Sequence, residues 1–329
     1  MWKGPLRDGI TQSLLNRFLE CPYSFYLYAI LGLEDPITQS PLNLWWGDTF
    51  HKGLELYIPS KDFKSSAEGM LDYLHERYPE APESFDYSTK KMLWVYKLNN
   101  FEGDWVTEEI IDEYIDVGPH KIRIRGKKDG ICRNHPQYGT VLAEHKAKGY
   151  IDPSKTREEL HVDLQCALYL STEEDCEWVF YDLIKIPEVQ KYGPAKKHKE
   201  SDKDYISRLF SGPCGSYKGQ YPIFLNEHNW VHQGIHHFPL EAQEQMMDFT
   251  IKPLILRLIE WYDYVTQPDF DHEDPKYFSS IFYRHPVRHF NARMTPSYNC
   301  NYHSYLIGES DLSDLVPVDS YFSELEEPT

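Results

Sequence analysis

The chain has 329 residues, of which 41% are hydrophobic and 15% aromatic, so it can bury a substantial core and is not disordered over most of its length. Its formal net charge of −18 argues against a polyanionic partner, and no apolar run approaches the roughly 20 residues that cross a bilayer. The N-terminus lacks the apolar segment of a secretory signal, and the six cysteines stand at irregular spacings that do not form a disulfide framework. We therefore expect a reduced, cytoplasmic protein that makes no membrane contact.

The distribution of the charges weakens the argument from the net charge. Residues 119–157 contain ten lysines and arginines but only three acids, and a second basic run lies within residues 185–203. The acids gather in residues 102–116 and from residue 309 onward. Each basic run alone could equally be a solvated face, but the local field around residues 119–157 is positive, which suits a phosphate-bearing substrate.

The first hundred residues predict helices. Thr11 or Ser13 is suited to cap a first helix, which Cys21-Pro22 interrupts and which continues through Leu27. Further helices are expected at residues 44–58, 65–78 and 88–101, separated by prolines.

From Trp105 on, the apolar pattern changes to the alternation that is typical of strands. Residues 126–132 either continue the second strand or turn back from it. The resulting order is β-β-β-α-β. The expected elements are strands at residues 110–117, 121–125 and 140–146, a turn at 134–139, a helix from 152 through 170, and a strand at 178–186.

The second half of the sequence is less regular. Residues 190–203 are polar and rich in lysine, which suits an ordered loop or a mobile arm. Residues 239–266 predict one long helix, kinked at Pro253, and the acidic residues from 309 on predict a loosely held tail.

No repeat or linker divides the sequence, so we predict a single α/β domain over residues 1–308. Its centre is a mixed β-sheet flanked by helices, with helical additions at both ends. The expected parts are a helical segment at 1–103, a core at 104–187, a loop-and-helix segment at 188–308, and an acidic tail at 309–329.

Glu144-His145-Lys146 ends the apolar strand at residues 140–146 and is the first candidate for chemistry. The acid and the lysine are two apart, so they point to the same side of a sheet. Glu144 is suited to hold a hard divalent cation, and the Lys146 ammonium to stabilise a nucleophile or a developing negative charge. Charged residues make up 26% of the chain, so the triplet alone is a weak signal.

Asp129 lies one strand upstream and strengthens that signal. Hydrolysis of a phosphodiester needs a metal that polarises the phosphate and generates hydroxide, and Mg²⁺ takes oxygen ligands, one or two of them carboxylates. Asp129 and Glu144 meet this need if their strands are neighbours. Lys146 would then orient or help to deprotonate the attacking water. The side chain of His145 points to the opposite face, but its backbone carbonyl could complete the coordination.

Asp129-Gly130 followed by Glu144-His145-Lys146 resembles the PD-(D/E)xK nuclease signature, with Lys128 in place of the usual proline. The sequence is most similar to the RecB-like and Cas4-like exonuclease branch, which includes many phage-encoded members. That branch also carries G-x-x-x-H upstream, matched by Gly47–His51, and Q-x-x-x-Y downstream, matched by Gln165–Tyr169. Its N-terminal segment is matched by Ser13, Phe18, Cys21, Pro22 and Phe25, so the matches follow in family order from residue 11 to about residue 187.

The resemblance implies a restriction-endonuclease-like core and a role for each matching residue. His51, Asp129, Glu144 and the carbonyl of His145 would bind Mg²⁺ or Mn²⁺. Lys146 would be catalytic, and Gln165 and Tyr169 would position Lys146, the water or the scissile phosphate. Taken singly, each has an ordinary structural interpretation: His51 as a histidine at a helix edge, Gln165 and Tyr169 as a polar pair on one helix face, and Asp129-Gly130 as a turn.

The cysteines depart from the pattern of many Cas4-like members, which hold an iron–sulfur cluster with one N-terminal and three C-terminal cysteines. Cys21 and Cys300 match two of these positions, but no cysteine follows Cys300 and the nearest upstream is Cys214. Four thiolates are the usual requirement, and His303 does not restore the set. We therefore expect no iron–sulfur cluster, with Cys21 packed in the core as a small hydrophobic residue.

The remaining histidines and cations are weaker candidates. His285 and His289 would share a helix face, but Pro286 and the lack of nearby cysteines argue against zinc. His232, His236 and His237 likewise form no recognisable zinc set. Arg284, Arg288 and Arg293 form either a DNA-binding patch or a solvated one. The further candidates for contact with DNA are Arg17, Lys148, Lys185, Lys196 and Lys197.

The sequence thus predicts a metal-dependent DNA nuclease, acting as an exonuclease on duplex ends or single strands in recombination, repair or DNA degradation in a bacterial or phage-infected cell. Binding would be mainly to phosphates, and a recombination or repair protein is an expected partner. Two alternatives stay open: a catalytically silent subunit of the same fold that binds DNA ends or a partner, and an RNA endonuclease.

Overall fold

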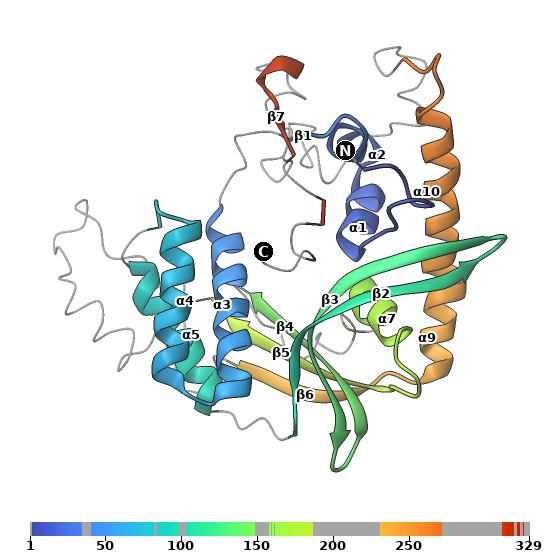
Figure 1. The fold of residues 1–329 in the computed structure, drawn as a ribbon. Coiled ribbons are helices and arrows are strands. Elements are labelled where there is room, and N and C mark those ends of the chain that lie inside the picture. The colour runs from blue at the N-terminus through green and yellow to red at the C-terminus, as the bar shows by residue number, and fades with distance from the viewer. Residues whose placement is uncertain are drawn as a thin grey trace, which may run out of the picture.

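The computed structural model describes residues 2–34, 41–81, 84–98, 103–148, 158, 160, 162–186, 231–271, 311–318, 321–322 and 325. A five-stranded mixed sheet stands at the centre, with strand order β2-β3-β4-β5-β6 (Figure 1). β4 and β5 are parallel and all other neighbours are antiparallel. The strands are β2 (Val106–Val117), β3 (His120–His135), β4 (Gly139–Lys148), β5 (Trp178–Lys185) and β6 (Val231–His237).

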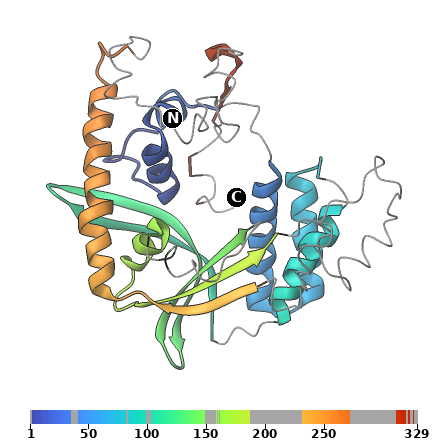
Figure 2. The same ribbon diagram turned by 180° about the vertical axis from the view of Figure 1, so that it is seen from behind.

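Helices form two groups on either side of the sheet (Figures 1 and 2). One group contains α3 (Pro41–Ser60), α4 (Phe63–Arg77) and α5 (Ser84–Leu98). The other contains α1 (Gln12–Glu20), α2 (Pro22–Phe25), α7 (Leu164–Leu170), α9 (Leu240–Met246) and α10 (Lys252–Val265). α7 lies in the connection between the parallel strands β4 and β5, as a parallel crossover requires.

Each helix group covers its own hydrophobic core, and the alternation of side chains along β4 explains why. Val141 and Ala143 belong to the cluster under α3–α5, whereas Leu142 belongs to the cluster under α1, α7 and α10. Because successive side chains point to opposite faces, Glu144 and Lys146 lie on the side of Leu142 and α7, and His145 lies on the side of α3 and α5.

The expected β-β-β-α-β order is confirmed, and residues 126–132 continue the second strand because β3 runs from His120 to His135. The predicted N-terminal helix is capped by Thr11, whose Oγ1 accepts a hydrogen bond from the Leu14 N–H at 3.2 Å. It breaks at Cys21-Pro22, as expected, and resumes as α2 and a π-helical turn, Tyr26–Ile30.

Several predicted boundaries are wrong. α3 continues through Pro59 to Ser60, and α5 begins at Ser84 and ends at Leu98. The helix expected from 152 through 170 is not continuous: Val162 and Asp163 are not helical. The Asp163 side chain accepts hydrogen bonds from the Gln165 and Cys166 N–H groups at 2.8 and 3.2 Å, so it starts a new helix, α7, at Leu164.

The predicted long helix at 239–266 contains a π-helical turn, Met247–Ile251, between α9 and α10. This turn ends two residues before Pro253, which has no N–H to donate and so disrupts the regular α-helical ladder. β6 was not predicted from the sequence, and neither was a short antiparallel pairing of β1 (Leu33–Glu34) with β7 (Val316–Pro317).

The expectation of a loosely held tail is wrong for the part of the tail that the structure describes. Leu315 is buried, and the Tyr321 hydroxyl donates a hydrogen bond to the Tyr28 carbonyl at 2.6 Å. The guanidinium of Arg125 lies 4.1 Å from the centre of the Phe322 ring. Apolar and aromatic side chains among the acids therefore hold this segment against the N-terminal helices and β3. The Lys-rich segment 190–203 lies outside the described residues.

No helix within the described ranges is both long and apolar enough to cross a membrane.

The Thr11 cap gives a test of the first helix. Thr11→Ala removes the oxygen that accepts from Leu14 N–H, and we expect the free energy of unfolding to fall by about 1 kcal/mol. Urea denaturation measures the change. Thr11→Ser keeps the accepting oxygen and should recover most of the loss, so equal losses in the two variants would contradict the capping role.

Candidate active site

Glu144 and Lys146 lie side by side at the end of β4 and form an ion pair. Glu144 is only 1% exposed, whereas the Lys146 side chain is 30% exposed. Gln165, near the start of α7, binds both: its Nε2 donates to Glu144 Oε2 and its Oε1 accepts from Lys146 Nζ, each at 3.0 Å. One amide therefore fixes the carboxylate relative to the ammonium.

Asp129 stands on β3 beside this pair. The strands are neighbours, as the sequence predicted, with Gly130 opposite Ala143 in the antiparallel register. Asp129 Oδ2 accepts a hydrogen bond from the His145 N–H at 2.8 Å, so the carboxylate is anchored to β4. Its Oδ1 lies 3.5 Å from His51 Nδ1 on α3. The segments carrying His51, Asp129 and Glu144 thus converge.

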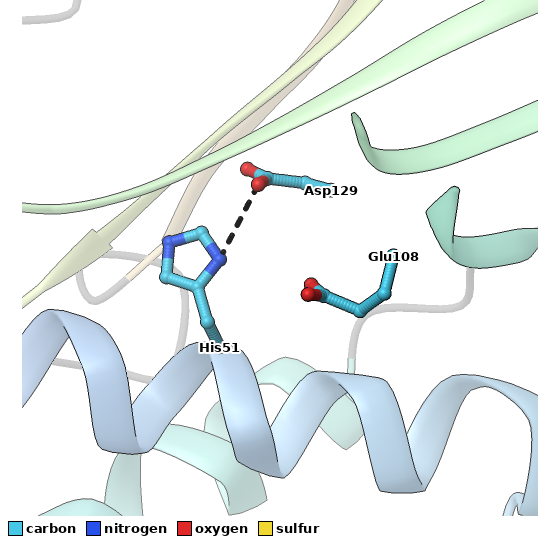
Figure 3. A group of neighbouring side chains, drawn as sticks. All are labelled: His51, Glu108 and Asp129. Atoms are coloured by element: carbon cyan, nitrogen blue, oxygen red, sulfur yellow. Dashed lines mark ion pairs between the residues drawn. The ribbon is translucent and has the colours of Figure 1, made fainter. Parts of the chain in front are cut away.

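Glu108 on β2 is a site residue that sequence reasoning missed. One ligand atom each from His51, Glu108 and Asp129 lie within 4.8 Å of one another, and Figure 3 shows the three side chains converging. Glu108 also forms an ion pair with Lys127. Two carboxylates and an imidazole at this spacing make a donor set suited to a divalent cation.

An unusual backbone conformation accompanies the placement of Glu108 in the site. Thr107 pairs with Gly130 and Glu109 pairs with Lys128, so the register is unchanged and Glu108 lies opposite Asp129. Its φ is +58°, in the left-handed region that residues other than glycine rarely adopt. Strain of this kind is concentrated at functional sites. The sequence signal was slight, because Glu108-Glu109 looks like two ordinary acids in a solvated strand.

Burial and charge perturb the acids of the site. Burial raises the pKa of Glu144 well above its usual range, against the attraction of Lys146 and with added repulsion from Asp129. Burial also raises the pKa of Glu108, and Lys127 opposes that shift. Burial lowers the pKa of Lys146. The attraction of nearby carboxylates is larger and raises the pKa overall; these carboxylates belong to Glu144, Asp163 and Asp129. Lys146 is therefore an ammonium ion at neutral pH in this arrangement.

Tyr169, one turn after Gln165, packs on β3. A Cβ built on Gly126 would lie 2.8 Å from the Tyr169 hydroxyl oxygen and from its Cε1 atom, so the ring lies directly over the glycine. Gly126 is three residues before Asp129. Tyr169 thus ties α7 to the strand that carries Asp129.

Lys128, which replaces the usual proline, points away from the metal ligands. It is 3% exposed and forms ion pairs with Glu109, at 3.0 Å, and with Glu173. Arg133 binds the same two carboxylates, at 2.7 and 2.8 Å. This charge network connects β2 and β3 to the turn after α7.

His145 also contributes through its side chain, on the face opposite Glu144. Its Nδ1 lies 2.9 Å from Asp182 Oδ2, and both residues are at most 1% exposed. The pair anchors the peptide whose N–H holds Asp129.

The residues predicted as weaker candidates, for contact with DNA or for zinc, lie on several different elements or outside the described residues. Arg17 stacks on the Tyr28 ring at 3.8 Å, and Lys148 lies two residues beyond Lys146 on β4, where it pairs with Lys185 of β5. Lys196 and Lys197 lie outside the described residues, as do His285, His289, Arg284, Arg288 and Arg293. His232, His236 and His237 lie on β6. Contact of the named lysines and arginines with DNA stays a prediction.

Cys21 is buried in the core beside α1, and its Sγ accepts a hydrogen bond from the Ser24 N–H at 3.4 Å. This fits the small hydrophobic role that we expected for it. Cys214, Cys300 and His303 lie outside the described residues, so the absence of an iron–sulfur cluster stays a prediction.

The sheet, the helix between its parallel strands and the convergence of His51, Asp129, Glu144 and Lys146 agree with one comparison. Residues 10–173 match the model of the PD-(D/E)XK nuclease superfamily. The matched range contains all of these side chains together with Gln165 and Tyr169, and the predicted fold class, an α/β fold with a mixed sheet flanked by helices, is confirmed. Assignment to the RecB-like and Cas4-like branch stays a prediction.

Two further comparisons add little to this match. A search of curated proteins finds no match. Among solved structures, the crystal structure of SSO0001 is 15% identical over 72% of this chain and 83% of its own, with a TM-score of 0.28. That similarity is too low to bear on fold or function.

The packing of Tyr169 on Gly126 can be tested by adding one methyl group. Gly126→Ala must displace the Tyr169 ring, and we expect the free energy of unfolding to fall by about 1–3 kcal/mol. Gly47→Ala is the matched control: its Cβ would meet nothing within 4 Å, and alanine favours the helix by up to about 1 kcal/mol. Urea denaturation of both variants checks the difference, and an unchanged Gly126→Ala protein would contradict the close packing.

Proposed function

We propose that the protein is a metal-dependent DNA nuclease that works as an exonuclease in recombination, repair or DNA degradation. The observation that carries the proposal is the double hydrogen bond of Gln165. It holds the Glu144 carboxylate and the Lys146 ammonium together next to the cluster of His51, Glu108 and Asp129. Folding alone does not require these groups to meet, because each charge would be more stable in water.

The donor set fits a Mg²⁺ or Mn²⁺ ion. Asp129 and Glu108 bring two carboxylates close together, and their mutual repulsion is relieved by a cation between them. Asp129, Glu108 and His51 would hold the ion, with Glu144 and the His145 carbonyl as the further ligands that the resemblance implies. When bound, such an ion polarises the scissile phosphate and lowers the pKa of a bound water.

Lys146 would act as a cation. Because neighbouring acids raise its pKa, its ammonium is suited to orient the attacking water and to offset the negative charge that develops on the phosphate. Gln165 would keep Lys146 directed toward the phosphate, and Tyr169 would keep α7 in place against β3. These groups contact backbone phosphate and not base edges, which favours weakly sequence-specific, salt-sensitive cleavage.

Substitution of Asp129 and Lys146 tests the proposal. We expect Asp129→Ala and Lys146→Ala each to lower Mn²⁺-dependent cleavage of DNA by at least about 10²-fold, because the first removes a metal ligand and the second the charge that faces the phosphate. Lys252→Ala is the control, since Lys252 on α10 is half-buried and pairs only with Asp248 among the described residues. Circular dichroism verifies that each variant is folded.

The substrates for this assay are end-labelled linear DNA, circular DNA and a labelled RNA strand. Loss of the linear DNA alone supports an exonuclease, and the order in which label is released gives its polarity. Cleavage of circular DNA would instead support an endonuclease, and preferential cleavage of RNA would contradict a DNA nuclease. Undiminished cleavage by folded Asp129→Ala protein would exclude this site as the nuclease centre.

Proton release should accompany metal binding. Burial raises the pKa of Glu144 and of Glu108, so these carboxyls hold protons at pH values where ordinary carboxyls have lost them. A cation must displace those protons, and its affinity should therefore fall as the pH is lowered. Calorimetric titration with Mn²⁺ in buffers of different ionisation enthalpy measures the protons released. Glu108→Gln should release fewer protons than the wild type, and equal release would contradict a role for Glu108.

A further inference from the structure

A cavity of about 620 Å³ adjoins the candidate active site on the side of α1. Lys146 and Gln165 line one end of it, so it is continuous with the place where the scissile phosphate would lie. α1 and α7 contact each other, and α7 also contacts α9 and the π-helical turn that follows α9. The cavity is open to solvent, and its other lining residues include Gln12, Asn16, Leu19, Met246 and Thr250.

The wall formed by α1 presents two amide side chains. Gln12 and Asn16 are one helical turn apart and therefore lie on the same face. Both are half-buried, and neither side chain makes a hydrogen bond to any residue that the structure describes. Gln165, by contrast, uses both of its amide atoms to hold Glu144 and Lys146. The amides of Gln12 and Asn16 are thus the donors and acceptors available to a ligand.

Several other side chains of the lining are neutral, and some of them are apolar. Met246 immediately precedes the π-helical turn and Thr250 lies within it, and turns of this kind occur frequently at functional sites. Leu19, at 46% exposure, and Val162, at 70%, place apolar surface at the rim. These side chains suit contact with a flat ring better than contact with an ion.

The charges of the cavity exclude a phosphate as its occupant. Lys146 is the one cation among the described residues that line it, and that ammonium is already paired with Glu144. Glu20 and Asp163 add two carboxylates to the lining. A phosphate would be repelled by these acids, whereas a neutral ring with hydrogen-bonding edges would not.

We propose that this cavity receives the nucleobase of a nucleotide next to the scissile phosphate, with Gln12 and Asn16 bonding its edge and Leu19 and Val162 packing on its face. The proposal rests on the proposed nuclease function. Asparagine and glutamine side chains pair with base edges because each offers one donor and one acceptor. Binding of the base would fix the strand so that the adjacent phosphate lies against Lys146.

The test places a single abasic nucleotide at each position of an end-labelled DNA strand in turn. For the wild-type protein with Mn²⁺, we expect the bond on one side of the abasic position to be cut about tenfold more slowly than in the intact strand. The double variant Gln12→Ala with Asn16→Ala should cut the intact strand about tenfold more slowly and lose no further rate at the abasic position. Gln245→Ala, an exposed amide on α9 outside the cavity, is the matched control and should behave like the wild type.

Equal cleavage beside abasic and intact nucleotides by the wild type would overturn the proposal, and so would an undiminished abasic effect in the double variant. A binding experiment separates this result from failure of the proposed function. With Ca²⁺ in place of Mn²⁺, a strand containing 2-aminopurine should change its fluorescence with the wild type and not with the double variant. Base-dependent binding without any cleavage would contradict the nuclease function alone, and cleavage without base-dependent binding would contradict the nucleobase site alone.

Discussion

The site depends on the burial of one carboxylate. Glu144 is almost wholly shielded from water, and a buried charge is tolerated only when it is paired and hydrogen-bonded. Lys146 provides the opposite charge, and Gln165 bonds both groups. Because Gln165 lies on the crossover helix between the parallel strands β4 and β5, the topology of the sheet places the amide over the charged pair.

A second network, made of ion pairs, stabilises the strands next to the site. Lys128 and Arg133 on β3 share the carboxylates of Glu109 on β2 and Glu173 after α7. Lys128 and Glu109 directly neighbour Asp129 and Glu108, so the network fixes the two strands that carry these candidate metal ligands. Proline at position 128 would stiffen one strand, whereas this lysine connects three segments. Loss of one buried partner would leave the others uncompensated.

Local patterns in the sequence were sufficient for much of the core. The alternation through residues 140–146 placed Glu144 and Lys146 on one face, and the short connection before Gly139 made the β3–β4 pairing predictable. The prediction of one continuous helix over residues 152–170 was wrong because Asp163 caps a new helix, α7, within that segment. β6 was missed because its sequence, Val231–His237, lacks a regular apolar alternation and takes its place only by pairing with β5.

The sequence by itself determined the fold class, the two-sided core and the residues that resemble a nuclease signature, because these depend on local periodicity and spacing. Only the tertiary structure decided that Glu108 joins His51 and Asp129, since the pairing of β2 with β3 places Glu108 opposite Asp129. The docking of Tyr321 on Tyr28 and the cavity beside Lys146 likewise arise between segments far apart in the chain. Such contacts depend on how the helices and strands pack against one another. The sequence of any one segment does not determine that packing.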